Sequence, residues 1–224
     1  MTLATRHSSL ILYLASASPG KLCEFREAAQ PRGIEVKVLP GFCRLTPCVE
    51  DGATFEENAR KKVLYYSAAT PQLVFADDSG LSVDALGGAP GVRSARFSGP
   101  NSTDAANNRK LLAELHRVEA ARGRRSEGAA PTRAAHYVCI IALARGGHIL
   151  TLVEGRVDGT IIDAPRGSGG FGYDPHFFYP PLGKTFAEIS AAEKFAISHR
   201  GQAFRKLLDF LKNESSPPTA SRPL

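Results

Sequence analysis

Two adjacent carboxylates, Asp77 and Asp78, are the residues best suited to chemistry. They follow an apolar run over 73–76 that predicts a buried strand, and Ser79 and Gly80 come directly after them. Carboxylates at the end of a buried strand are costly unless a metal ion, a cation or backbone donors lie nearby. The pair therefore indicates a polar site at this strand end, although two acids that cap an ordinary turn would give the same pattern.

A second candidate is the polar loop after the first predicted strand. The segment 10–30 is typical of a strand, a tight loop and a helix, with Ser18 as N-cap and Pro19 as the first helical residue. Free N–H groups at the helix N-terminus, with Lys21 one turn in, would form an anion site. An ordinary capped helix with a solvated lysine explains the same residues.

A third candidate lies at 50–66. Thr54 and Glu57 match a capping box that begins a helix, and Asn58 and Lys62 share one face of that helix. Glu50 precedes the helix, where a carboxylate is electrostatically favoured. Glu50 as a metal ligand and Lys62 as a phosphate- or water-positioning cation is the functional interpretation, and the pattern alone does not decide. The residues expected to face the core are Phe55, Ala59, Val63 and Tyr66.

A glycine cluster within 159–180 ends in Phe171, Gly172, Tyr173 and Asp174. An aromatic ring beside flexible glycines and a carboxylate could form a base pocket, with a surface for stacking and an acceptor for a ring N–H. Glycine-aromatic loops also close ordinary sheets, so this pattern alone is weak.

His199 and Arg200 follow Ser198 at the start of the last predicted helix. Cations are unfavourable at a helix N-terminus. An anion or a nucleotide nearby would explain them, whereas a histidine without such a partner would be an ordinary surface residue.

The composition is that of a soluble globular protein, with 224 residues, 43% hydrophobic and 22% charged. A net charge of +6 suits an anionic partner, from nucleic acid down to a nucleotide. Four cysteines without a C-x-x-C motif indicate reduced thiols and a cytoplasmic protein, and the apolar runs are too short to span a membrane.

The elements that must position these residues form one predicted domain over 1–213, with two lobes. Besides those above we expect a strand over 34–39, a helix within 99–115, and a hairpin of 136–144 and 148–157 turned by 145–147. The arginine-rich segment 121–133 is typical of an inserted basic loop, and 214–224 of a disordered tail.

Several motifs, in this order, carry a resemblance. They are S-A-S-x-G-K, E-D-G-x-T-F-x-E-N-A-x-x-K, A-D-D-S-G-L-x-V-D-A-L-G-G-A-P-G-V, G-S-G-G-F-G-Y-D-P and K-x-x-I-S-H-R-G-x-A. From about Leu12 to Leu211 the chain resembles the Ham1 family of inosine triphosphate pyrophosphatases, in the form closer to the bacterial RdgB-type enzymes.

The resemblance implies an α/β fold, with an elongated central mixed sheet flanked by helices and a cleft between two lobes. It also implies a homodimer that uses Mg²⁺, with Mn²⁺ as a substitute. The implied reaction hydrolyses ITP, dITP or XTP to the nucleoside monophosphate and pyrophosphate, which removes deaminated purines from the nucleotide pool. No membrane association and no stable nucleic-acid complex are expected.

The matched motifs also imply roles. Asp78 would be the general base or the metal-linked activator of the attacking water, with Asp77 beside it and Lys62 on phosphate. Glu50 and Asp78 would bind the metal. The implied substrate-binding residues are Ser16, Ser18, Lys21, Ser79, Phe171, Gly172, Tyr173, Asp174, Lys194, His199 and Arg200.

One departure concerns the first loop, where the family usually carries T-G-N-x-x-K and this chain has S-A-S-P-G-K at 16–21. This loop also resembles that of the Maf proteins, which hydrolyse pyrimidine or modified triphosphates. A Maf-like pyrophosphatase is therefore one alternative. A basic nucleic-acid-binding module that uses the 121–133 arginines is another, and it would show steep salt dependence.

Overall fold

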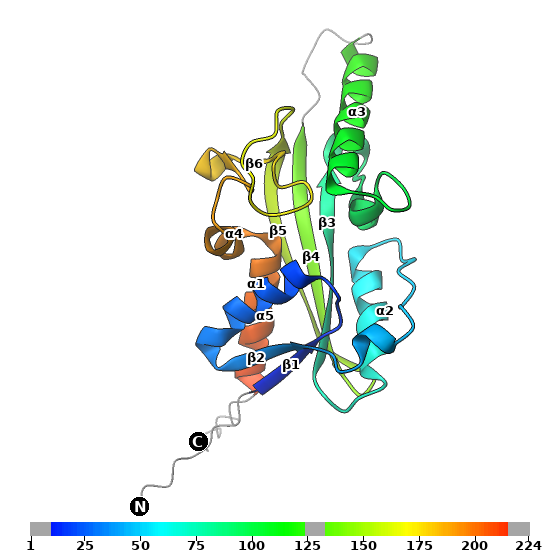
Figure 1. The fold of residues 1–224 in the computed structure, drawn as a ribbon, viewed down its shortest axis with the longest axis vertical. Helices are drawn as coiled ribbons and strands as arrows, with labels where there is room; N and C mark the ends of the chain where they lie inside the picture. Colours follow the sequence, from blue (N-terminus) through cyan, green and yellow to red (C-terminus); the bar gives the residue numbers. More distant parts are fainter. Residues whose placement is uncertain (1–9, 124–132, 215–224) are drawn as a thin grey trace, which may run out of the picture.

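The computed structural model describes residues 10–123 and 133–214, which form an elongated α/β molecule around one mixed sheet (Figure 1). The described strands, in the order β2-β1-β3-β4-β5-β6-β7 across the sheet, confirm the predicted fold class. They are β1 Leu10–Leu14, β2 Ile34–Val38, β3 Val74–Val83, β4 Ala134–Arg145, β5 His148–Ile161, β6 Phe177–Tyr179 and β7 Lys184–Thr185. The α-helices are α1 Pro19–Ala29, α2 Phe55–Ser67, α3 Asp104–Gly123, α4 Ala191–Ile197 and α5 His199–Glu214.

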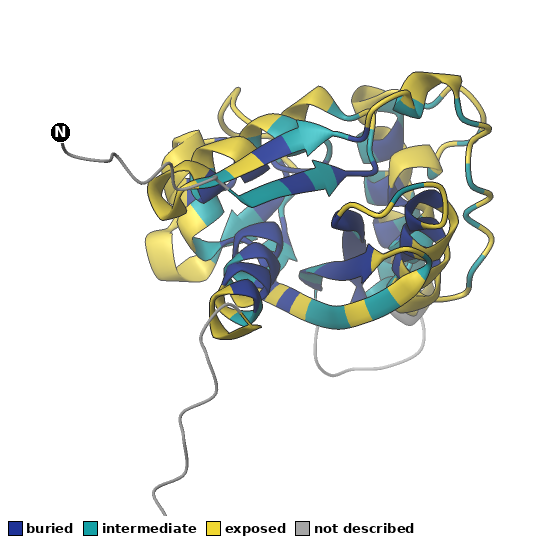
Figure 2. Ribbon diagram, turned by 90° about the horizontal axis from the view of Figure 1, so that it is seen from below, coloured by how far each residue is buried: buried dark blue, intermediate teal, exposed yellow. Residues whose placement is uncertain are grey.

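The sheet has two faces with different helices on them. α1 and α5 pack on one face, and α2 packs on the other against β3 and β4. Because side chains alternate along a strand, Phe75 belongs to the α1–α5 core, whereas Val74 and Ala76 belong to the α2 core. Figure 2 shows the buried residues gathered on the strands and on the helix sides that face them.

The parallel part of the sheet ends early. β1 is parallel to β3 but pairs with it only at Tyr13–Val74 and Leu14–Phe75, whereas β3 and β4 stay paired in antiparallel register to Val83. Further along β3, the short 3-10 helix Gly91–Arg96 covers the side that β1 has left, and Leu81 N–H donates to Ser94 Oγ there. Between these two contacts β3 carries the acidic pair.

The predicted hairpin is confirmed, since Gly146 and Gly147 turn β4 into β5 with φ of 56° and 80°. The expected N-caps Ser18 and Thr54 also accept from the backbone as predicted, but Glu57 accepts from Ala53 N–H and not from the N-cap. Phe55 is only partly buried.

Two boundaries differ from the prediction. Asp77 and Asp78 lie in the middle of a ten-residue strand, not at its end, because β4 pairs with β3 through both residues. α3 continues through Gly123, so the start of the expected 121–133 loop is helical. The rest of that loop, 124–132, and the expected tail from 215 onward lie outside the described residues. No helix that the structure describes is long and apolar enough to cross a membrane.

Gly155 sets the distance between β5 and α5, which carries His199 and Arg200. A Cβ at this position would lie 1.9 Å from His199 O and 2.6 Å from Ala203 N, so the helix would have to move away. We expect Gly155→Ala to lower the free energy of unfolding by about 1–3 kcal/mol, as overpacking does. Urea unfolding measures this, with Glu154→Ala on the exposed neighbour as control, and equal stability of both variants would contradict the close approach.

Candidate active site

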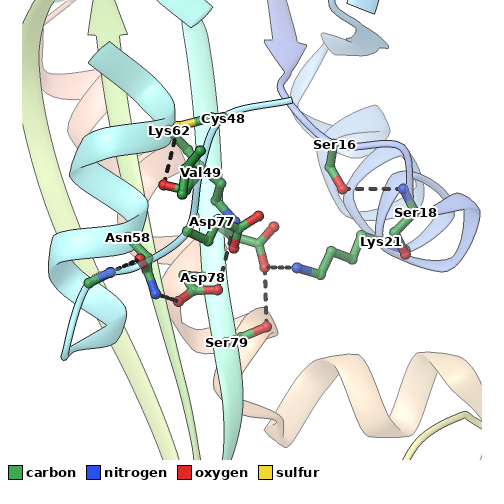
Figure 3. Close-up of polar contacts among 12 residues, drawn as sticks. Ser16, Ser18, Lys21, Cys48, Val49, Asn58, Lys62, Asp77, Asp78 and Ser79 are labelled. Carbon is green, nitrogen blue, oxygen red and sulfur yellow. Dashed lines mark hydrogen bonds and ion pairs between the residues drawn. The ribbon is translucent and has the colours of Figure 1, made fainter. Parts of the chain in front are cut away.

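The two adjacent carboxylates of β3 point to opposite faces of the sheet (Figure 3). Asp77 extends toward α1, and Asp78 extends toward α2. The cause is the two-residue period of the strand, which gives neighbours opposite directions. The two carboxylates therefore contact different helices and different lysines, Lys21 for Asp77 and Lys62 for Asp78. The candidate site includes residues on both faces of β3.

Asp77 is fully buried and lies among cations. Its Oδ2 is 2.7 Å from Lys21 Nζ and 4.0 Å from Arg200 Nε, and it accepts from Ser79 Oγ at 3.2 Å. Burial alone would raise the pKa of Asp77, but Lys21, Arg200 and Lys62 together lower it to about 2. Asp77 is thus a permanent anion, and its Oδ1 has no hydrogen-bond partner within the described chain.

Asp78 has a different environment. Its Oδ2 accepts from Asn58 Nδ2 at 3.1 Å, and its Oδ1 lies 3.7 Å from Lys62 Nζ. Burial raises the pKa of Asp78, and the opposing effects of Lys62 and Asn58 do not cancel it. A carboxyl with a raised pKa is better suited to accept a proton than one held near 2.

Lys62 Nζ connects Asp78 to Glu50, whose Oε2 is 3.1 Å away. Burial lowers the pKa of Lys62, but the carboxylates Asp77, Asp78 and Glu50 outweigh burial and raise it. The lysine is therefore a cation, and it contacts both carboxylates that were predicted to bind a metal. The side chain of Glu50 is 35% exposed and so is accessible to a ligand.

The first loop is organised by its own serines. Ser16 Oγ accepts from Ser18 N–H at 3.2 Å, and Ser18 Oγ accepts from Lys21 N–H at 3.4 Å. These bonds orient the N-terminus of α1 and its Lys21 toward Asp77, as Figure 3 shows. Both hydroxyl groups keep their O–H donors for a ligand.

A second buried ion pair joins Asp174, which precedes β6, to Lys194 of α4. Asp174 Oδ2 also accepts from Phe171 N–H at 2.9 Å, and Tyr137 Oη donates to its Oδ1. Burial raises the pKa of Asp174, whereas Lys194 opposes the shift. The ring of Phe171 is 43% exposed and lies beneath two cations, 4.6 Å from Lys194 Nζ and 5.4 Å from Arg200.

His199 is buried and neutral. Its ring stacks on Tyr137 at 4.7 Å, and burial, helped by Arg200 and Lys194, lowers its pKa well below the usual value. Its Nδ1 has no hydrogen-bond partner among the described residues. An unpaired buried nitrogen beside an open cavity is suited to bind a polar group of a ligand.

One cavity of about 170 Å³ lies among some of the residues described above. The predicted residues that line it are Lys21, Ser79, Phe171, Gly172, Tyr173, Asp174, Lys194, His199 and Arg200. The other predicted residues do not line it. Asp78, Lys62 and Glu50 lie on the α2 side of β3, and Ser16 and Ser18 lie behind Lys21 in the first loop.

Glu24 is not among the predicted site residues, although its carboxylate accepts a hydrogen bond from the Arg200 guanidinium at 2.6 Å. Burial lowers the pKa of Arg200, but Glu24 and Asp77 raise it more, so the guanidinium stays charged. Glu24 follows Lys21 by one helical turn, and this spacing was the available signal. Tyr137 and Ser94 also line the cavity, but no sequence pattern marked them as site residues.

Comparisons with known proteins support the family resemblance that the sequence motifs indicate. The model of the Ham1 family matches residues 12–210. The chain is 47% identical over 197 residues to the dITP/XTP pyrophosphatase of Syntrophobacter fumaroxidans, covering 88% of this chain and 80% of that one. It is 46% identical over 209 residues to the dITP/XTP pyrophosphatase of Acidobacterium capsulatum, covering 89% and 97%.

Solved structures of Ham1 proteins have a fold similar to that of this chain. The Ham1 protein of Coxiella burnetii superposes with a TM-score of 0.78 at 38% identity, covering 91% of this chain and 99% of that one. The Ham1 protein of Staphylococcus aureus gives 0.76 at 37% identity, covering 92% and 100%. Fold, motifs and family model agree, and the chain belongs to the Ham1 family.

Proposed function

We propose that the protein hydrolyses dITP, XTP and ITP to the nucleoside monophosphate and pyrophosphate. The observation that carries this proposal is the acidic pair of β3 with cations on both faces, because Lys21 and Arg200, the cations on Asp77, also line a cavity that holds an aromatic ring. Its relatives at 47% and 46% identity are dITP/XTP pyrophosphatases, which supports the same substrate class. The sanitising of the nucleotide pool follows from that chemistry.

Lys21 and the N-terminus of α1 are the proposed phosphate-binding groups, with the hydroxyls of Ser16, Ser18 and Ser79 as further donors. A triphosphate carries several negative charges, and attack by water on it needs charge neutralisation more than covalent chemistry. In the structure Lys21 is already paired with Asp77, so its ammonium is held in place before a substrate arrives.

Glu50 and Asp78 are the proposed ligands of Mg²⁺. No three histidine, cysteine, aspartate or glutamate side chains converge into a metal cluster in 10–123 and 133–214. Mg²⁺ fits nevertheless, because it usually takes one or two carboxylates and completes its shell with phosphates and water. Both carboxylates already face one cation, Lys62 Nζ. When bound, the ion would neutralise phosphate charge and polarise the reacting centre.

Asp78 is the proposed general base. It would take a proton from the water whose oxygen attacks the α-phosphorus, while the bond from that phosphorus to the bridging oxygen breaks and pyrophosphate leaves. Asn58 orients the carboxylate through its 3.1 Å hydrogen bond, and Lys62 keeps positive charge beside it. Asp77, fully buried and paired with Lys21, is better suited to hold Lys21 and Arg200 than to move protons.

Phe171 and the polar groups around it form the proposed base pocket. The exposed ring offers a stacking surface, while Lys194, His199 and Asp174 supply donors and acceptors. A 6-oxo purine with a protonated N1 differs from adenine in its hydrogen-bonding pattern at both positions. Buried groups built for the oxo form would be left unpaired by ATP, which discriminates strongly.

The expected homodimer and cytoplasmic location are also proposals. All four cysteines are free thiols in the structure, which supports a reducing compartment. Light scattering on the purified protein measures the dimer directly. The Maf-like alternative is not favoured, since the curated relatives are dITP/XTP pyrophosphatases.

Pyrophosphate release with Mg²⁺ from ITP, XTP, dITP, ATP, GTP, dTTP and UTP tests the proposed substrate class. We expect turnover of the first three nucleotides, because only these present a deaminated purine to the pocket. Preferred turnover of dTTP or UTP would instead support the Maf-like alternative and make the S-A-S-P loop decisive.

Asp78→Asn removes the proposed base but keeps an oxygen for Asn58. We expect kcat to fall by about 10²–10⁴, the usual contribution of a general base, with an unchanged circular dichroism spectrum and Tm. Asp84→Asn is the control, since Asp84 is an exposed carboxylate just after the same strand. Full activity of Asp78→Asn would remove Asp78 from this role.

Glu50→Gln removes one proposed metal ligand. We expect the Mg²⁺ concentration for half-maximal activity to rise at least about 10-fold, because even outer-shell changes at metal sites cost about 10–100-fold. The exposed Glu56, paired only with Arg60 in the ion pairs of the described chain, gives the control Glu56→Gln. An unchanged Mg²⁺ titration would contradict the assignment.

A further inference from the structure

Two side chains of α3 form hydrogen bonds with the backbone N–H and C=O groups of Gly172. Gly172 N–H donates to Asp104 Oδ2 at 2.6 Å, and Gly172 O accepts from Asn108 Nδ2 at 2.9 Å. Asp104 is the first residue of α3 and Asp104 and Asn108 are one helical turn apart, so their side chains lie on the same face. Gly172 has a φ of 64°, in the left-handed region that favours glycine. We call these two contacts the Gly172 clamp.

The clamp completes the fixation of the segment 171–174, which carries the proposed base-binding groups. Phe171 N–H donates to Asp174 Oδ2, and Tyr173 Oη donates to Ser94 O at 2.8 Å. The clamp is what holds the residue between them, and it comes from a helix outside this segment. The clamp therefore adds to the contacts that position Phe171 and Asp174, since it fixes the backbone between them.

The same turn of α3 also holds a second segment that contributes to the cavity lining. Asn107, 3% exposed, accepts from Ser98 N–H at 2.8 Å and donates to Ala95 O at 3.3 Å. Ala95, Asn107, Asp104 and Gly172 all line the cavity. One helical turn thus contacts two segments of the cavity lining.

Asn108 contributes little besides this contact. Its Oδ1 is buried and has no partner among the described residues, so this oxygen is an unsatisfied polar atom that destabilises the fold. Its Nδ2 bond to Gly172 is the hydrogen bond that the side chain provides in return.

We propose that Asp104 and Asn108 are positioning residues that set base selectivity by holding Gly172. This inference rests on the proposed function, since selectivity presupposes a purine in the cavity. Hydrogen bonds weaken steeply with misalignment. A segment that shifts would therefore lose contacts to the correct base and could rearrange around a wrong one.

Asp104→Ala and Asn108→Ala each remove one arm of the clamp. We expect kcat/KM for dITP to fall about 5- to 10-fold, mainly through KM, because a hydrogen bond contributes about 1 kcal/mol. The value for dATP should change less than about 2-fold, because adenine lacks the 6-oxo group and the protonated N1 that the pocket recognises, so the dITP:dATP ratio falls. Asp104→Asn keeps an acceptor oxygen and should restore the ratio.

Asp104 also favours the helix electrostatically, but Asn108 does not, so a shared effect of both alanine variants identifies the clamp and not helix stability. Arg109→Ala, at an exposed position on the same helix, is the control. Equal losses for dITP and dATP, which leave the ratio unchanged, would overturn the selectivity role.

Hydrogen–deuterium exchange of the peptide over 170–174 provides a readout that needs no turnover. We expect faster exchange in both alanine variants than in the wild type and Arg109→Ala. If the wild type does not turn over dITP, the proposed function is wrong. The exchange measurement still tests whether Asp104 and Asn108 hold Gly172, because it needs no turnover. Unchanged exchange in both variants would overturn the clamp itself.

Discussion

The structure depends on keeping two adjacent carboxylates charged inside a sheet. An ionised carboxylate without partners is too costly in a protein interior, so each must be compensated. Strand alternation sends Asp77 to α1 and α5 and Asp78 to α2, so helices on both faces must supply cations and donors. Because β1 ends early, β3 has no strand partner on that side at the acidic pair.

Compensation before binding also prepares the site for an anion. Lys21 and Lys62 are held by carboxylates, and Arg200 is held by Glu24. Such cations need little rearrangement when phosphate arrives, and preorganised charge is the main source of electrostatic catalysis. The same carboxylates limit the net attraction for phosphate, and the proposed Mg²⁺ would restore the balance if it binds together with the substrate.

Much of this could be predicted from local patterns, and the rest could not. N-caps, the hairpin and the motif residues depend on neighbours in sequence, which the pattern contains. Asp77 and Asp78 lie inside β3 because β4, far along the chain, pairs with both residues. The predicted end of the strand before Asp77 was therefore wrong. Arg200 and Glu24 are 176 positions apart, and Asp104 meets Gly172 across 68, so only packing brings them together.

The interrupted partnership of β1 and β3 has a consequence for the main chain. Odd-numbered residues of β3 turn their backbone groups to the β1 side, where Phe75 O and Leu81 N–H are bonded. By the two-residue period, the backbone groups of Asp77 and Ser79 face the same side, where the ladder is interrupted. A short open strand edge thus lies in the middle of the sheet, next to the cavity that Ser79 and Gly80 line, and its free backbone groups are a template for hydrogen bonding. Side-chain substitutions leave that template intact, and only proline would remove a donor from it.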